Sequence, residues 1–130
     1  MTATARVNII NFLRACEPRR EMDLIEPIRE QLRLIRELKL PATWLLQYDA
    51  LLDEHIVGLL TENLDERQEV GVWLEVVQPQ VEAAGIVWRG RFPWDWHSHV
   101  GFTIGYSPKE RERLMDVLMA RFHDVFGQYP

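Results

Sequence analysis

Two hydrophobic periodicities alternate along the chain. Three runs are rich in apolar and β-branched residues, as is typical of buried strands: residues 7–13 (VNIINFL), 42–47 (ATWLLQ) and 69–77 (EVGVWLEVV). Their apolar stretches are nearly continuous instead of alternating with polar residues. This pattern predicts parallel strands that are covered on both faces.

Between these runs, apolar residues recur at spacings of three and four, which is the pattern of an amphipathic helix. Residues 23–40 carry such a stripe, and Pro27 fits its first turn. Asp53 can cap a short second helix that extends to Leu64. Residues 79–84 can form one or two helical turns.

The last helix has the clearest boundary signals. Ser107 and Glu110 form a capping box at its start, and Gly127 follows its last apolar position. A long irregular stretch, residues 85–106, precedes it. The order strand, helix, strand, helix, strand, loop, helix predicts right-handed β-α units and a parallel sheet, hence an α/β fold.

Three strands would leave an open sheet with exposed edges. Either a second copy supplies partner strands, or residues 1–130 are a single domain that forms the N-terminal portion of a larger (β/α) barrel. Such a barrel typically needs about 250 residues, so we favour the partial barrel. In isolation the chain is then expected to self-associate, as a homo-oligomer, unless its C-terminal half is present.

Composition narrows the class of protein. The chain is 47% hydrophobic and 27% charged with a net charge of −5, which is ordinary for a globular protein and excludes a disordered one. An acidic chain without a basic stripe is a poor candidate for binding nucleic acid. One cysteine, Cys16, excludes an internal disulfide framework. No stretch reaches membrane-spanning length and no leader is visible, so we expect no membrane partner and a cytoplasmic location.

Polar residues follow each predicted strand. In parallel α/β proteins, ligands gather at the carboxyl ends of strands, so these residues should share one rim. The alternative is that each caps a strand or pairs across a loop. The residues are Arg14 and Glu17 after the first strand, Gln47, Tyr48 and Asp49 after the second, and Glu75 and Gln78 at the third.

Aromatic residues concentrate in the segment 88–99 (WRGRFPWDWHSH). Indole faces beside charged groups suit sugar rings, because apolar C–H faces stack on the ring while hydroxyls bond the charges. The alternative is a long loop held down by its buried aromatics. The candidate substrate-binding residues are Arg14, Trp88, Arg91, Trp94 and Trp96.

The same segment contains a candidate metal set. Asp95, His97 and His99 alternate, so in an extended chain they would point to one side, and two imidazoles with a carboxylate suit a divalent metal such as zinc. Glu75 could complete the set. Histidines in loops are also common as simple hydrogen-bonding residues, so both interpretations stand. We expect the whole segment to lie on the same rim as Asp49 and Glu75.

Three runs resemble a known superfamily. Residues 7–14 (VNIINFLR), 40–51 (LPATWLLQYDAL) and 68–75 (QEVGVWLE) resemble the first three strand regions of a bacterial branch of the polysaccharide deacetylase-like (glycoside hydrolase/deacetylase) barrels. The resemblance implies the N-terminal half of such a barrel, of the glycoside hydrolase/deacetylase type. The superfamily's metal-dependent deacetylases carry paired aspartates where this chain has Leu13 and Arg14, and their His-x-x-x-His motif is absent here.

The resemblance implies a carbohydrate-active hydrolase or deacetylase that acts on a polysaccharide or another glycan. Glu75 and Asp95, with Asp49 beside them, are then the candidate catalytic acid and base. The alternative is a non-catalytic relative that binds a glycan or a partner after losing the metal site. Arg14, in place of an aspartate, favours this alternative, whereas the aspartate and histidines beside tryptophan favour catalysis.

Overall fold

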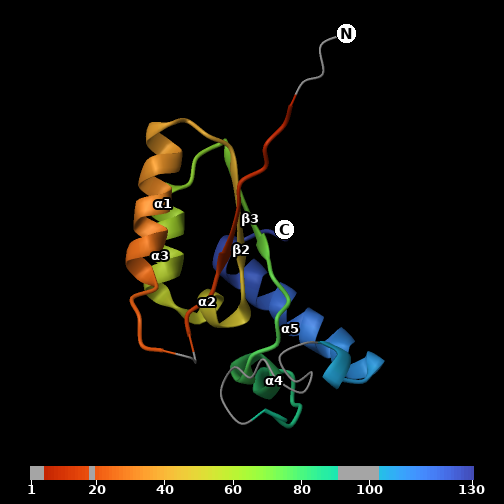
Figure 1. The fold of residues 1–130 in the computed structure, drawn as a ribbon. Coiled ribbons are helices and arrows are strands. Elements are labelled where there is room, and N and C mark those ends of the chain that lie inside the picture. Colours follow the sequence, from red (N-terminus) through yellow and green to blue (C-terminus); the bar gives the residue numbers. More distant parts are fainter. Residues whose placement is uncertain (1–4, 18–19, 91–102) are drawn as a thin grey trace.

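The computed structural model describes residues 5–17, 20–90 and 103–130. Three parallel strands form one sheet in the order β1-β2-β3. The pairing of β1 with β2 begins with Ile10 opposite Thr43, and that of β2 with β3 begins with Ala42 opposite Gln68. Figure 1 shows how the helices surround it. The elements are β1 (Ile10–Leu13), α1 (Ile25–Glu37), β2 (Ala42–Leu46), α2 (Tyr48–Leu52), α3 (Glu54–Asn63), β3 (Gln68–Val72), α4 (Gln78–Ala83), the 3-10 turn η1 (Thr103–Gly105) and α5 (Pro108–Phe126).

The parallel strands in chain order are confirmed, but the partial (β/α) barrel is wrong. The described residues form an open sheet, in which β1 and β3 each pair with β2 alone. A barrel requires every strand to pair on both sides so that the sheet closes on itself. No further strand in the described ranges meets the outer edge of β1 or β3.

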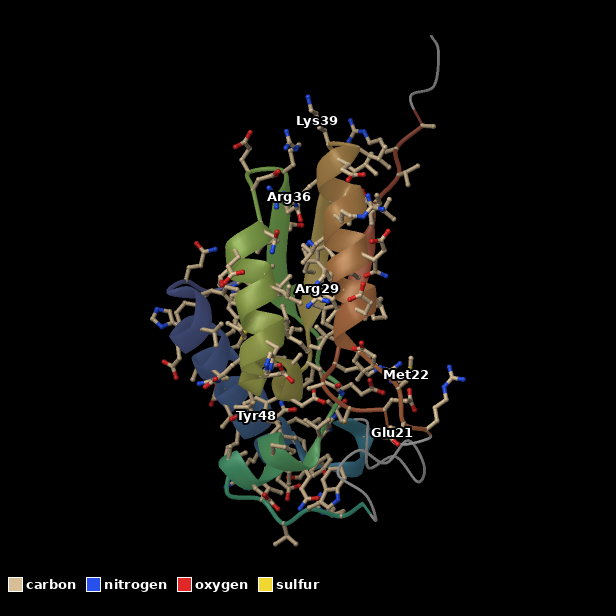
Figure 2. The ribbon with its side chains drawn as sticks, turned by 90° about the vertical axis from the view of Figure 1, so that its left-hand side faces the viewer. Glu21, Met22, Arg29, Arg36, Lys39 and Tyr48 are labelled. Carbon is tan, nitrogen blue, oxygen red and sulfur yellow. The ribbon has the colours of Figure 1, made fainter. Side chains whose placement is uncertain are left out.

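One face of the sheet carries the hydrophobic core. Figure 1 shows α1 and α3 on the same side of the strands, and Figure 2, which faces that layer, shows them side by side with α5 beyond α3. The apolar stripe of α1 packs here through Ile28, Leu32 and Ile35, over the fully buried Trp44 of β2. The core continues through Leu13, Leu46, Leu51, Ile56, Leu60, Val77, Leu118 and Phe122.

The other face of β1 has no helix over it (Figure 1), so the predicted coverage of both faces is wrong. Ile10 and Phe12 alternate with the buried Leu13 and are half exposed. The register aligns Phe12 with Leu45 and Gly71 across the three strands. We call this side the open face. Near β3 the chain end approaches it, with Pro130 beside Gly71.

The third strand is shorter than predicted and ends at Val72. β2 ends at Leu46 because the chain turns into α2 at Tyr48, a helix that the sequence analysis missed. The last bond between the two strands runs from the Trp73 N–H to the Leu46 carbonyl at 2.9 Å. Residues 73–77 therefore have no neighbouring strand with which to pair.

The predicted caps of α3 and α5 are confirmed, whereas α1 spans Ile25–Glu37 and is shorter than the predicted 23–40. Asp53 accepts hydrogen bonds from two backbone N–H groups at the start of α3. Ser107 and Glu110 make both bonds of the capping box, and Gly127 ends α5 with a left-handed φ of 72°. Among the described residues, no helix has the length and apolar character needed to cross a membrane.

Candidate functional site

The carboxyl ends of the strands bring several predicted site residues to one edge of the sheet. Two hydrogen bonds connect the segments that leave neighbouring strands. The Ala15 N–H donates to Asp49 Oδ2 at 3.1 Å, joining the chain after β1 to α2. The Gln47 Nε2 donates to the Glu75 carbonyl at 3.1 Å, joining the chain after β2 to the chain after β3. Asp49 and Glu75 thus follow adjacent strands at the edge where the sequence predicts a rim.

Asp49 is a buried carboxyl group that links two elements. Its Oδ1 accepts from the Ala50 N–H at 2.8 Å, in addition to the bond from Ala15. Burial raises the pKa of the Asp49 carboxyl above its ordinary value, and the hydrogen bonds it accepts, first that from Cys16, oppose this shift. Asp49 therefore serves the packing of the edge, and its raised pKa also suits a proton donor.

Cys16 lies against this carboxyl group. Burial, followed by the negative charge of Asp49, raises the pKa of the Cys16 thiol to about 12. The nearby Arg14 lowers it by less. A thiol with such a pKa is almost fully protonated at neutral pH, so Cys16 is a poor nucleophile. Its role is that of a small, half-buried packing residue.

Other charged residues at this edge are also buried or paired. Glu75 is buried, with 3% of its surface exposed. Arg14 forms an ion pair with Glu17 across 3.7 Å, and the Glu17 side chain is itself mostly buried. The predicted substrate-binding Arg14 thus stands at the predicted edge, in contact with a carboxylate of its own loop.

An aromatic pair on the open face was not predicted. The rings of Phe12 and Trp73 meet edge to face, with centroids 5.0 Å apart and planes at 64°. Phe12 is 56% exposed, and Trp73 directly follows β3 at the carboxyl edge. Both residues lie in predicted strands, but only the register that aligns β1 with β3 through β2 shows that their side chains meet.

Trp88 packs away from this pair, against a second apolar cluster that includes Val81, Tyr106 and Leu114. The adjacent Arg89 lies 4.8 Å from the centroid of the Tyr106 ring and donates to the Gly105 carbonyl at 2.7 Å. This part of the predicted sugar-binding segment thus joins η1 and α5. The other residues predicted there lie outside the described residues: Arg91, Trp94, Asp95, Trp96, His97 and His99.

The predicted metal set of Asp95, His97 and His99 belongs to that same segment. Within residues 5–17, 20–90 and 103–130, no group of three or more His, Cys, Asp or Glu side chains could hold a metal ion. Glu75, the proposed fourth ligand, is the one member of the set that the structure describes.

Two hollows lie elsewhere on the molecule. An open one of about 590 Å³ lies at the opposite, amino edge of the sheet, between residues 7–10, 41–43 and 66–69. A smaller one of about 280 Å³ lies between α2, α3 and α5, where the Arg121 guanidinium donates to the Leu51 carbonyl. The sequence analysis predicted neither hollow, because it placed all ligand chemistry at the carboxyl edge.

Comparison of the chain with protein-family models, with curated proteins and with solved structures found no match.

Proposed function

We propose that the chain binds a carbohydrate through the aromatic pair of Phe12 and Trp73 on the open face. The observation that supports this proposal is the pair itself, 5.0 Å between ring centroids, with Phe12 56% exposed and Trp73 partly buried, next to the carboxyl edge of a parallel sheet. Ligands of open α/β sheets bind at that edge. The resemblance to carbohydrate-active barrels at the sequence level points to the same class of ligand.

The chemistry of the neighbourhood suits a sugar. The axial C–H groups of a pyranose form an apolar face that stacks on an indole or phenyl ring, which buries area without requiring a charge. Hydroxyl groups at the ring margin need hydrogen-bond partners. Arg14, which follows β1 and is partly exposed, bears such groups. An apolar platform with a few polar groups beside it is the usual composition of a ligand site.

Titration calorimetry of the whole chain with cello-, xylo- and chito-oligosaccharides tests this proposal. We expect at least one class to bind, and we expect Trp73→Ala and Phe12→Ala each to weaken that binding about tenfold, as loss of one stacking contact of about 1.4 kcal/mol predicts. The matched control is Ile104→Ala, at an exposed apolar residue of η1. Binding that survives both aromatic substitutions, or no binding to any class, contradicts the proposal.

A second candidate function is hydrolysis of the bound glycan. The observation that favours it is the pair of buried carboxyl groups, Asp49 and Glu75, after adjacent strands, one of them with a pKa raised by burial. A glycosidase needs one carboxyl group that stays protonated and one that does not. Release of reducing ends from the oligosaccharide that binds, lost in Glu75→Gln while binding persists, is the expected result. Equal release by wild type and Glu75→Gln excludes this role.

A further inference from the structure

The outer edge of β1 presents backbone groups that no strand among the described residues pairs with. β2 donates to the carbonyls of Ile9 and Leu13, both at 2.9 Å, so the odd-numbered residues of β1 turn their backbone toward β2. Alternation then turns the N–H and C=O groups of Ile10 and Phe12 outward. In the part of the chain that the structure describes, no strand pairs with that edge. Such an edge is a template for another strand.

β1 is short, but its edge lacks two other features that usually prevent pairing. Charged residues and proline commonly protect edge strands, yet residues 7–13 (VNIINFL) contain neither. The opposite edge differs, because β3 carries Glu69 and contacts α5. Of the two edges, β1 is therefore the one suited to accept a further strand.

A flank of α1 extends the same surface. Arg36 donates to Asn63 Oδ1 at 2.7 Å and so faces α3, as Figure 2 shows. Leu34 and Leu38 stand two positions before and after Arg36, which is about 200° around the helix. They therefore lie on the flank away from α3, on the β1 side of α1. Both are exposed, Leu34 to 41% and Leu38 to 64%.

We propose that two copies of this chain associate through antiparallel pairing of their β1 strands, which joins the sheets and sets the two α1 helices side by side. A two-fold interface of this kind needs only a self-complementary surface, and a strand edge is one. The pairing satisfies the outward backbone groups of Ile10 and Phe12. The adjacent α1 helices cover Leu34 and Leu38.

The available area is close to what a stable dimer needs. Val7 is 80% exposed and Ile10 50%, in addition to Leu34 of α1 and Leu38, the residue that caps its end. With about 200 Å² for a large side chain, these fractions supply at most roughly 500 Å² per copy, against about 800 Å² in a standard interface. The strand backbone and the polar side chains of α1 supply the remainder.

Charge selects the register of the pair. If Ile10 faced Ile10 of the other copy, Arg6 would face Arg14, and like charges opposite one another destabilise a sheet. A register in which the two-fold axis passes between the two Asn11 residues, and not between the two Ile10 residues, removes that repulsion. Ile10 then faces Phe12, Arg14 faces Asn8, and the two Asn11 residues meet on the two-fold axis.

Sedimentation velocity over a concentration series tests the association. We expect the wild-type chain to sediment as a dimer and Ile10→Lys as a monomer, because a lysine on an edge strand opposes pairing with a further strand and here would stand opposite Phe12 of the other copy. Ile104→Lys places the same charge on a more exposed isoleucine of η1 and should stay dimeric. Circular dichroism verifies that both variants are folded. A wild-type monomer at every concentration, or a dimer that Ile10→Lys leaves intact, overturns the proposal.

Disulfide crosslinking tests the register without destabilising the strand. In a Cys16→Ser background, Asn11→Cys should oxidise to a covalent dimer, because residues facing each other in this register lie about 4.5 Å apart between Cα atoms. Val7→Cys is the control: it is more exposed, but the two copies of residue 7 would be about 26 Å apart. Crosslinking at Val7 and not at Asn11 contradicts the register, and crosslinking at neither contradicts the strand pairing.

Discussion

Replacing Asp49 with alanine removes the carboxyl group that connects the end of β1 to α2. The N–H groups of Ala15 and Ala50 lose their acceptor, and so does Cys16. A hydrogen bond to a charged acceptor contributes about 1.5 kcal/mol or more, so the bonds from Ala15 and Ala50 alone predict a loss of about 3 kcal/mol. Removal of a buried charge offsets part of this loss. We expect the free energy of unfolding of Asp49→Ala to fall by about 2 kcal/mol at neutral pH.

Urea unfolding, followed by tryptophan fluorescence, measures this loss, and its pH dependence tests the cause. The pKa of Asp49 is higher in the folded chain than in the unfolded chain. As the pH rises above 3.8, Asp49 therefore loses its proton first in the unfolded chain. The free energy of unfolding falls until the pH passes the pKa of Asp49 in the folded chain. Asp49→Asn does not titrate. The stability of Asp49→Asn relative to wild type should therefore rise as the pH increases above about 4. A flat or falling difference, or an Asp49→Ala that unfolds like wild type, would refute the reasoning.

Three further predictions concern other sites. Gly58 lies within α3 with open space around it, so Gly58→Ala should raise the free energy of unfolding by about 0.5–1 kcal/mol, whereas Gly127→Ala, at φ 72°, should lower it by about 1 kcal/mol in the same urea assay. The hydrogen bonds from Arg89, first, and from the Ser107 backbone lower the pKa of Glu110 to about 2. The stability this carboxylate contributes is lost as pH falls from 4.5 toward 2, and acid titration of Glu110→Gln should show a smaller loss. Iodoacetamide should label Cys16 far more slowly in the folded chain than in urea, because its pKa is about 12; equal rates would contradict this burial.

Much of the fold was predictable because its signals are local. The apolar stripe of α1 and the caps at Asp53 and Ser107 each depend on residues within a few positions of one another. The three strands were predicted, but which faces of the sheet are covered, and that the sheet stays open, were not predictable in the same way. A run such as VNIINFL has the same composition whether one face or both are buried. The barrel was predicted from the order of elements, which an open sheet shares.

The candidate site was predictable only in its position. The sequence shows that polar residues follow each strand. Asp49 and Glu75, which follow adjacent strands, do lie at one edge of the sheet. That the Asp49 carboxylate binds backbone N–H groups depends on a helix, α2, which the pattern of residues 42–52 does not reveal. The contact of Phe12 with Trp73 depends on the register of three strands. Such contacts are set by tertiary structure.

The most direct measurement for the proposed carbohydrate site is the indole N–H signal of Trp73 in a ¹H–¹⁵N spectrum, assigned with Trp73→Phe. Titration with the oligosaccharide that binds should shift this signal in step with saturation, because the sugar would lie on the ring. The indole signal of the fully buried Trp44, which donates to Gln68 at 3.0 Å, should stay in place. A Trp73 signal that does not move while the ligand saturates the chain would contradict the proposed site.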